Sequence, residues 1–453
     1  MNAPSHTFDF YPAPPLVADY LSGGDSRCFF HFTPDETGLA RRLEHLGKNE
    51  VVITCGHQAC LLGGPLYVAY KILTAVNLCR FVRDRFGVTA TPLFWLADDD
   101  DDTVEVATAR SPFGHTLHIK AENRHVTGLL PSPAGTLEDL PAISAENWGG
   151  YHKKLLRQLF GKYGVTVMSP LEKETQKLRA PFFNVFEPVT KTLWNNVLKR
   201  TEELREAGFK PQVPIREGDR FLYMLQGNQR ARLNGNASLK EGTPLTSALS
   251  RLASLEYALP VLADVSGPAE TAYHAETAPF YESLGRRMPV IWPRFSATLV
   301  RENDERILAQ AGSTPGEIIL DRQKAELRAA LQSLPDKAQK ALERFEGGLN
   351  TLYDDLRETL SPLDRGLPGA VEAGRRKALL TRSYIEKKLS AAARRQLFAG
   401  NSPLALAYDF LYPGTLQERY YNFVFFTYEN PGFLDRLLET VDPFSFKHTR
   451  IRI

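Results

Sequence analysis

The sequence has little cysteine, no long apolar run and almost no net charge, and each scarcity excludes a class of protein. Four cysteines in 453 residues are too few for a disulfide framework, so we expect a reducing cytoplasm. Residues 1–15 lack a basic segment followed by an apolar one, and no apolar run is long enough to cross a membrane, so we expect neither export nor a membrane span. The chain has 55 Lys and Arg against 53 Asp and Glu, which argues against binding nucleic acid by bulk charge.

The remaining composition is that of a globular protein. Hydrophobic residues make up 43% of the chain and charged residues 24%, which excludes wholesale disorder and low-complexity classes. At roughly 150 residues per domain, the length corresponds to two or three domains.

Two segments far apart in the chain follow the order strand, turn, helix, strand. The first has apolar runs at 51–54 and 92–97 around a Gly63-Gly64-Pro65 turn and a helix over 66–83. The second has a strand over 258–263, a turn at 267–268, a helix over 270–284 and a strand over 289–292. This order is typical of parallel α/β sheets. We therefore expect one open α/β sheet, interrupted by a long insertion.

The insertion and the last third of the chain have their own patterns. The insertion predicts helices over 151–161 and 172–208 and a hairpin over 221–233 centred on Gly227-Asn228. Later, apolar residues from Phe345 to Leu363 recur every three or four positions, and Pro362 and Pro368 mark a turn. We expect an antiparallel helical hairpin that projects or dimerises, although a helix pair lying on the core is the alternative. The expected segments are a core of 1–112 and 241–302, an insertion of 113–240, an arm of 303–400 and a C-terminal segment of 401–453 that packs back on the core.

Polar residues follow three of the expected strands. The first strand ends at Gly56-His57-Gln58, the second at Asp98 to Asp102 with Glu105 nearby, and the third at Gly267 to Glu270. Ligands of open α/β sheets bind outside the carboxyl ends of the strands. If the three strands are neighbours, these groups converge on one pocket.

Each motif alone has a functional and a plainer interpretation. His57 and Gln58 are placed to contact a phosphate, with the Gly63-Gly64 backbone at a helix start and Lys71 within the helix; a tight turn with a surface histidine and a solvated lysine is the alternative. Five successive aspartates repel one another unless a divalent metal or an amino group compensates them, and an exposed acidic loop is the alternative.

Glu270 and the cysteines also allow two interpretations. Glu270 lies at an expected helix N-terminus, where it either caps the helix or has a functional role, binding a substrate ammonium or acting as a base. Tyr273 and His274 follow on the same helix, and simple packing is the plainer interpretation of both. Cys55, His57, Cys60 and Cys79 include zinc-ligand types, but their spacing is not a standard structural pattern, so a metal site there is the less favoured interpretation.

With these segments in view, the chain resembles the cysteine-adding enzymes of bacillithiol biosynthesis, the cysteine ligases of a low-molecular-weight thiol pathway. The resemblance is carried by blocks in the right order across most of the chain: CGHQACLLGGPLYVAYKILTAVNL from Cys55, FWLADDDDDTVEV from Phe94, LPVLADVSGPAETAYHAETAPFYE from Leu259, MPVIWPRFSATL from Met288 and LYPGTLQERYYNF from Leu411.

The resemblance implies a Rossmann-like core of the nucleotidyltransferase type, interrupted by connecting inserts, and an α-helical coiled-coil arm that forms a homodimer. It implies attachment of L-cysteine to the amine of glucosaminyl-malate in the last step of bacillithiol biosynthesis. An amide bond needs an activated carboxylate, so ATP is the expected co-substrate, with an adenylate-like intermediate, and Mg²⁺ is a candidate ion.

By position, the family's site residues fall on the motifs above. We predict catalytic roles for His57, Asp100, Asp102 and Glu270. The predicted substrate-binding or nucleotide-binding residues are Gly56, Gln58, Gly63, Gly64, Lys71, Asp99, Glu105, Arg251, Gly267, Tyr273 and Arg294. Two of the predicted residues depart from the family pattern: His57 stands in place of a glutamine, and Arg251 lacks the proline that usually follows it.

Two departures from the family pattern keep other functions open. Asp101 replaces a histidine, and Ala269 stands where glycine or serine is common. One alternative is therefore another ATP-dependent amide-forming ligase or nucleotidyltransferase on the same core. A second alternative is a non-catalytic dimeric scaffold whose helical arm is the working part.

Overall fold

The computed structural model describes residues 34–120, 125–133, 142–208, 210–233, 238–239 and 242–453. The chain forms two compact units. The core unit contains the described residues up to 297 together with 418–449, and the arm unit contains 298–417 with 450–453. The segment boundaries expected from the sequence stay predictions, because compactness does not test whether a segment folds on its own.

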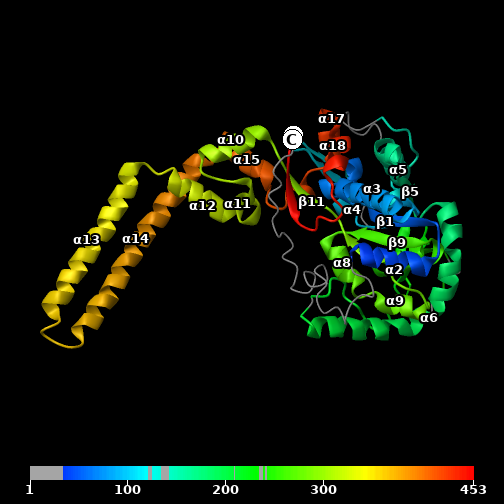
Figure 1. Cartoon of the computed structure of the whole chain (residues 1–453), viewed down its shortest axis with the longest axis horizontal. Coiled ribbons are helices and arrows are strands. Elements are labelled where there is room, and N and C mark those ends of the chain that lie inside the picture. Colours follow the sequence, from blue (N-terminus) through cyan, green and yellow to red (C-terminus); the bar gives the residue numbers. More distant parts are fainter. Residues whose placement is uncertain (1–33, 121–124, 134–141, 209, 234–237, 240–241) are drawn as a thin grey trace. The chain divides into compact units, whose positions relative to one another are not determined.

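A five-stranded parallel sheet in the order β10-β9-β1-β2-β5 forms the centre of the core unit (Figure 1). Its strands are β1 (Glu50–Gln58), β2 (Thr89–Ala97), β5 (Thr166–Met168), β9 (Val261–Ser266) and β10 (Val290–Pro293). The sheet confirms that the two distant sequence segments build one α/β layer. Its edge strand β5 lies within the expected insertion, where three residues are too few to give a periodic signal.

Helices cover this sheet and connect its strands. The longest helix in a connection between neighbouring strands is α3 (Leu66–Phe86), which links β1 to β2 and is buried along most of its length. The other core-unit helices are α2 (Glu36–Leu46), α4 (Thr103–Val106), α5 (Trp148–Phe160), α6 (Lys173–Glu206), α7 (Ala248–Ala258), α8 (Pro268–His274), α9 (Ala278–Ser283), α17 (Phe423–Glu429) and α18 (Phe433–Thr440). Short 3₁₀ helices are η2 (Leu61–Gly63), η3 (Thr127–Leu129) and η4 (Gly161–Tyr163).

The expected single helix over 270–284 is wrong, because the chain forms α8 and α9 there. Pro279 lies in the first turn of α9. A proline has no amide hydrogen to donate to the preceding turn, so it is favoured where a helix begins and disfavoured within one. The break also lets the carboxylate of Glu276 accept a hydrogen bond from the Gln212 amide at 3.2 Å.

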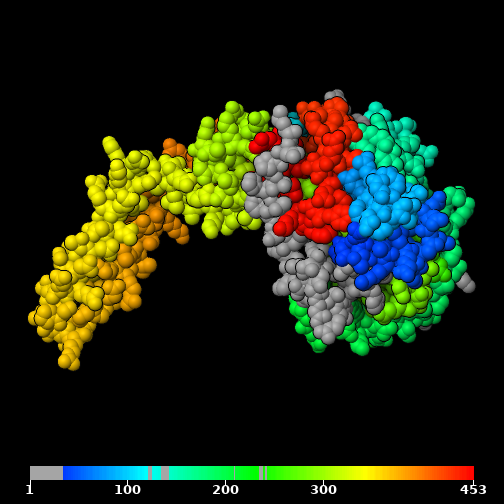
Figure 2. Space-filling view, viewed as in Figure 1, coloured from blue at the N-terminus to red at the C-terminus, as the bar shows by residue number. Residues whose placement is uncertain are grey.

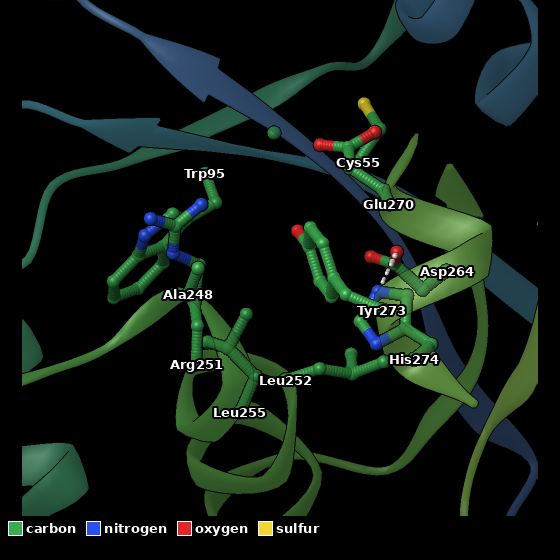
Figure 3. A pocket seen from close by; sticks show the side chains of 11 residues that line it. Cys55, Trp95, Ala248, Arg251, Leu252, Leu255, Asp264, Glu270, Tyr273 and His274 are labelled. Atoms are coloured by element: carbon green, nitrogen blue, oxygen red, sulfur yellow. Dashed lines mark ion pairs between the residues drawn. The ribbon is translucent and has the colours of Figure 1, made fainter. Parts of the chain in front are cut away.

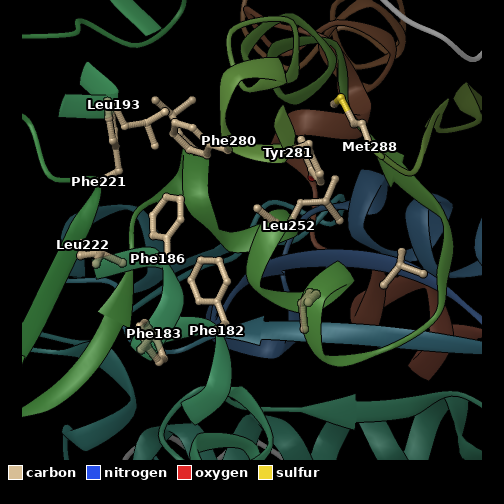
Figure 4. Close-up of a cluster of buried hydrophobic side chains, with 14 of the residues drawn as sticks. Phe182, Phe183, Phe186, Leu193, Phe221, Leu222, Leu252, Phe280, Tyr281 and Met288 are labelled. Carbon is tan, nitrogen blue, oxygen red and sulfur yellow. The ribbon is translucent and has the colours of Figure 1, made fainter. Parts of the chain in front are cut away.

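The predicted hairpin of the insertion is confirmed as β6 (Leu222–Gln226) and β7 (Gln229–Arg232), and β8 (Thr243–Thr246) pairs with β6 as a third strand. A separate two-stranded sheet joins β3 (Thr108–Arg110) to β4 (Thr116–His118). Buried aromatic side chains bind the hairpin and α6 to the rest of the unit (Figure 4). The rings of Phe182 and Phe186 stack at 4.7 Å, and Phe186 meets Phe280 of α9 edge-on at 5.6 Å.

The segment 418–449 packs on the core unit, where Figure 2 shows it in red against blue residues from the start of the described chain. The amide of Leu66 donates to the carbonyl of Tyr421 at 2.8 Å. From α3, the Asn77 side chain donates to the carbonyls of Leu438 and Val441. The Asn77 bonds hold the C-terminal end of α18 against α3.

The arm unit confirms the predicted helical hairpin. Its long helices α13 (Asp336–Leu360) and α14 (Leu367–Leu397) run side by side and are joined by a short turn that contains Pro362 (Figure 1). The remaining helices of this unit are α10 (Glu302–Gln310), α11 (Pro315–Leu320), α12 (Arg322–Gln332) and α15 (Pro403–Leu411). Three elements contain residues of both units: α16 (Gln417–Tyr420) and the paired strands β11 (Ser296–Val300) and β12 (His448–Arg452). Within the described residues, no helix combines the length and apolar character that crossing a membrane requires.

Candidate active site

Three neighbouring strands bring the predicted motifs to one edge of the sheet. Because β9, β1 and β2 are adjacent and parallel, the residues at their carboxyl ends lie at the same edge. His57 and Gln58 end β1, the aspartates follow β2, and Gly267 follows β9. The sequence-based expectation that the three strands are neighbours is confirmed.

A pocket opens at this edge (Figure 3). It is lined by Cys55, Gly56, Trp95, Ala248, Arg251, Leu252, Leu255, Asp264, Glu270, Tyr273 and His274. The Tyr273 ring stands between the wall formed by Arg251 and Trp95 and the wall formed by Asp264 and His274. Four of the residues predicted to bind substrate or act in catalysis therefore face one cavity: Gly56, Arg251, Glu270 and Tyr273.

Glu270 is fixed by a buried lysine and by its own helix. The Lys71 ammonium forms an ion pair with the Glu270 carboxylate and donates to the Gly56 carbonyl at 2.9 Å. The same carboxylate accepts from the Gly267 amide at 2.6 Å, which caps α8. Burial raises the pKa of Glu270, but Lys71 and the Gly267 amide bring this pKa below its usual value. The carboxylate is therefore charged at neutral pH, and both the capping and the binding interpretations of Glu270 have structural support.

Asp264 supplies a second carboxylate to the pocket. Its oxygens accept from the Thr54 hydroxyl at 2.7 Å and the Ser266 hydroxyl at 2.6 Å, and His274 Nε2 lies 3.5 Å away. Burial raises the pKa of Asp264, yet the His274 contact and the two hydroxyls bring it below its usual value. This side of the pocket consequently has two ionised carboxylates.

Arg251 supplies the positive charge on the other side. It lies in the first turns of α7, whose N-terminus is capped by Ser247. Burial lowers the pKa of Arg251, but Tyr273 and Asp99 lead the nearby acidic groups that raise it above its ordinary value. The pocket therefore offers a guanidinium and two carboxylates to a ligand, charges that match the carboxylate and ammonium of a free amino acid.

His57 belongs to a second polar cluster beside the pocket. Its Nε2 lies 2.5 Å from the Tyr67 hydroxyl and its Nδ1 lies 3.4 Å from the Cys60 sulfur. Burial, followed by the nearby Lys71, lowers the pKa of His57 to about 4, so the imidazole is neutral at pH 7. Cys55, Cys60 and Cys79 are buried free thiols, and Cys28 lies outside the described residues.

Gln58 and Asp100 connect this cluster to the hairpin. Gln58 Nε2 donates to Asp100 at 2.8 Å, and the other Asp100 oxygen accepts from Arg230 at 2.8 Å. Burial raises the pKa of Asp100, but Arg230 and Gln58 lower it below its usual value. His57, Gln58 and Asp100 do not line the pocket of Figure 3.

The five aspartates divide between interior and surface. Asp98 and Asp99 are buried, Asp100 is half-buried, and Asp101 and Asp102 are exposed. Asp102 accepts from the Glu105 amide at 3.2 Å and so caps α4, which places a predicted catalytic residue in a structural role as well. No cluster of three or more potential metal ligands is found among the described residues.

The sequence matches two domains of one known protein family. It matches the description "Bacillithiol biosynthesis BshC, N-terminal Rossmann-like domain" over residues 31–138 and 134–243, and "Bacillithiol biosynthesis BshC, C-terminal coiled-coil domain" over 297–453. The chain belongs to the BshC family. Its fold class is accordingly a Rossmann-like α/β core with a C-terminal coiled-coil domain, as the sequence predicted.

Individual relatives of the BshC family match most of the chain. A protein of Solibacter usitatus named "Putative cysteine ligase BshC" is 26% identical over 86% of this chain and 81% of its own length. The protein of the same name from Geobacillus kaustophilus is 25% identical over 95% of this chain and 89% of its own length. A solved structure titled as an arginyl-tRNA synthetase of Campylobacter jejuni aligns over 84% of this chain and 98% of its own, but at 10% identity and a TM-score of 0.27 it carries no argument.

Three predicted binding residues of this BshC chain contact other parts of the protein. Gly63 and Gly64 have positive φ angles of 74° and 97°, and a Cβ at Gly63 would lie 2.7 Å from the Phe423 ring. Arg294 forms two hydrogen bonds with the buried carboxylate of Glu418. The turn and Arg294 therefore hold the C-terminal segment, and their predicted contacts with substrate stay predictions.

Asp264 and two further arginines were missed by the sequence-based reasoning. Asp264 interrupts the apolar run from Leu259 to Val265, and a carboxylate within a buried strand is a signal that was available. Arg230 and Arg179 gave no comparable signal, because one follows a hairpin turn and the other lies on a long helix rich in charge.

Proposed function

We propose that this BshC-family chain is a ligase that joins L-cysteine to the amine of glucosaminyl-malate, with ATP as the co-substrate that activates the cysteine carboxylate. The observation that carries the proposal is the charge distribution of the pocket, which has Glu270 and Asp264 on one side and Arg251 on the other. Family membership supplies the pathway, and the charge distribution is complementary to an amino acid.

The proposed binding mode follows from those charges. The cysteine ammonium lies against Glu270 and Asp264, and the cysteine carboxylate points toward Arg251, because ionised hydrogen bonds are the strong ones. Tyr273 between the walls excludes water from the bound amino acid. Lys71 keeps Glu270 ionised and oriented, so its role is to position a substrate ligand.

The proposed chemistry is transfer of the cysteine acyl group through an adenylate. The carboxylate oxygen attacks the α-phosphate of ATP and pyrophosphate leaves; the acceptor amine then attacks the acyl carbon, the amide bond forms and AMP leaves. We place His57 and Gln58 near the phosphate or adenylate. The nitrogen of the acceptor amine loses a proton as the amide bond forms, and the neutral His57 imidazole is the group that we propose to accept that proton. We propose Mg²⁺ as the companion ion of ATP. Among the described residues, no group of three or more potential metal ligands is found.

The direct test is a reconstituted reaction. The purified full chain should convert L-cysteine, glucosaminyl-malate and ATP to bacillithiol, AMP and pyrophosphate, as followed by mass spectrometry, and omission of any substrate should stop the reaction. Formation of a different amide when other amines replace glucosaminyl-malate would favour a related ligase. An inert protein with intact fold would support the scaffold interpretation.

We also propose that the chain is a cytoplasmic homodimer formed through α13 and α14. Large apolar side chains are exposed along this hairpin, among them Leu352, Leu356, Leu380 and Ile385. Monomers rarely expose a continuous row of such side chains. The matching family description for this part of the chain is a coiled-coil domain, and a second copy of the same hairpin is the occupant that we propose.

A further inference from the structure

Three arginines, one of them buried and two half-buried, lie beside the pocket, and two of them have no role in the binding mode above. Arg179 of α6, Arg230 of β7 and Arg251 of α7 form what we call the arginine cluster. Thr246 links the first two, because its hydroxyl accepts from Arg179 at 3.0 Å and its carbonyl accepts from Arg230 at 2.8 Å. Arg179 and Arg251 are close enough to repel each other. Figure 3 shows Arg251 extending from α7 toward Trp95, whose ring also packs against Arg179 at 4.8 Å.

The cluster contains more positive than negative charge. The carboxylates that face it are Asp99, which attracts Arg179 and Arg251, and Asp100, which is paired with Arg230. Glu270 also attracts Arg251, but it is already paired with Lys71. Three guanidiniums therefore share two carboxylates, Asp99 and Asp100, besides the lysine-paired Glu270. A buried excess charge is unfavourable unless a partner compensates it.

Hydrogen-bond donors are also left over. Within the described part of the chain, nothing accepts a hydrogen bond from Arg179 Nη1, Arg230 Nε or Arg251 Nε, although all three atoms are buried. Most buried donors in folded proteins have an acceptor. A purely structural brace would explain the contacts of Arg179 with Thr246 and Ser254. Asp99 Oδ1 is a buried acceptor without a donor, but the three unused donors outnumber it, and a brace does not explain that excess.

We propose that the arginine cluster is an anion subsite that binds charged oxygens of a substrate beside the amino-acid pocket. Guanidinium groups bind carboxylate and phosphate equally well by paired N–H donors. This inference rests on the proposed function, under which two sources supply such oxygens: the malyl carboxylates of the acceptor and the phosphates of the nucleotide. Arg251 also lines the amino-acid pocket, while Arg179 and Arg230 belong to the subsite alone.

The test is a binding titration that needs no turnover. L-malate alone and inorganic pyrophosphate alone are titrated by calorimetry into the full wild-type chain and into Arg230→Gln. Loss of one charged hydrogen-bond partner should weaken binding roughly 10- to 100-fold. Weakened malate binding identifies the acceptor as the source, weakened pyrophosphate binding identifies the nucleotide, and either result supports the subsite.

The matched control is Arg232→Gln, on the same strand and over the same Tyr223 ring but exposed and paired with Asp219. It should change affinity by no more than about twofold. If circular dichroism shows that Arg230→Gln is misfolded, Arg230→Lys takes its place, because lysine keeps the positive charge but lacks the paired N–H donors of a guanidinium. Wild-type chain that binds neither anion at millimolar concentration, or affinities unchanged by both Arg230 variants, overturn the subsite. A chain that binds anions through the cluster but makes no bacillithiol contradicts only the proposed reaction.

Discussion

Lys71 is the side chain that holds Glu270 ionised and in place. The lysine side chain is 2% exposed and the glutamate 25% exposed, so the pair is shielded from water on the lysine side. A lysine buried this deeply needs an anionic partner. The pair serves both residues: Lys71 holds Glu270 ionised, and Glu270 gives the buried Lys71 side chain an anionic partner beside the Gly56 carbonyl.

Glu270→Gln should therefore lower kcat/KM for cysteine roughly 10- to 100-fold, because a charge-assisted bond to the substrate ammonium becomes a neutral one. It should also lower the free energy of unfolding by about 1–3 kcal/mol, since Lys71 loses its anionic partner. Steady-state kinetics and denaturant unfolding measure the two effects. Glu282→Gln, an exposed glutamate of α9, is the control. Near-wild-type kcat/KM in a folded Glu270→Gln protein would remove Glu270 from the substrate site.

His152 predicts how the stability of the protein changes with pH. It is fully buried in α5, where burial, only partly opposed by the Trp148 carbonyl, lowers its pKa to about 4. The unfolded chain binds a proton near pH 6.5, and the folded chain does not until about pH 4. The unfolded state thus carries more protons in between, so the stability present above pH 6.5 is lost as the pH falls toward 4.

His152→Phe should reduce the loss of stability between pH 7.5 and pH 5 by about 2 kcal/mol. Carboxylates with raised pKa values, such as Asp98, act in the opposite direction, but they are the same in both proteins and cancel in the comparison. Denaturant unfolding at the two pH values gives the difference, with the exposed His115→Phe as reference. Equal pH dependence in wild type and His152→Phe would show that His152 does not resist protonation.

At this scale the sequence predicts which residues gather at the sheet edge but not how they pair. Gly56, Arg251, Glu270 and Tyr273 were placed at a common site, and they line one pocket. The ion pair of Arg230 with Asp100 joins residues 130 positions apart. Such a contact depends on how the hairpin packs, which no local spacing encodes.

Among the elements, the turn before α3 shows how a glycine connects distant segments. Gly63 and Gly87 both have positive φ angles, 74° and 67°. A Cβ at Gly63 would meet the Phe423 ring at 2.7 Å, whereas a Cβ at Gly87 would meet nothing within 4 Å. An alanine at Gly87 therefore tests the left-handed backbone alone, whereas an alanine at Gly63 adds a steric clash with Phe423.

Gly63→Ala should lower the free energy of unfolding by about 1–3 kcal/mol more than Gly87→Ala, since only the first forces Phe423 to move. Gly87→Ala should itself cost about 1–2 kcal/mol from its left-handed backbone. Denaturant unfolding of both variants tests the difference, and Gly63→Ala combined with Phe423→Leu should recover part of it. Equal destabilisation by the two alanine variants would mean that segment 418–449 does not press on the turn.

Elements with a strong period or a clear turn were predictable, and short ones were not. The hairpin β6–β7 and the helices α5, α6, α13 and α14 follow from turn chemistry and helical spacing. The strand β5 has only three residues, and its place in the sheet is decided by pairing with β2. The break between α8 and α9 was signalled by Pro279, although the sequence-based prediction was one helix across it.

For the whole molecule, the proposed dimer depends on the exposed row of the arm. The side chains of Leu352 and Leu380 are 58% and 69% exposed, although each lies on a helix that packs against the other in the same hairpin. Burial of such side chains is worth about 1.5–3 kcal/mol each, and a twofold interface buries every one of them twice. A second hairpin therefore has enough apolar surface to bind to.

The full chain should run as a dimer in size-exclusion chromatography with light scattering, and Leu352→Glu combined with Leu380→Glu should be a monomer. A twofold interface contains each substitution in both copies. The introduced carboxylates therefore face apolar surface and repel one another across the interface. Lys340→Glu, also exposed on α13, changes charge on the same helix away from the leucines and should leave the dimer intact. A double variant that remains dimeric, or a wild-type chain that is monomeric at micromolar concentration, would place any self-association elsewhere on the molecule. Because the substitutions lie on the arm, the pocket of the core unit should still bind cysteine in the monomer, which separates assembly from chemistry.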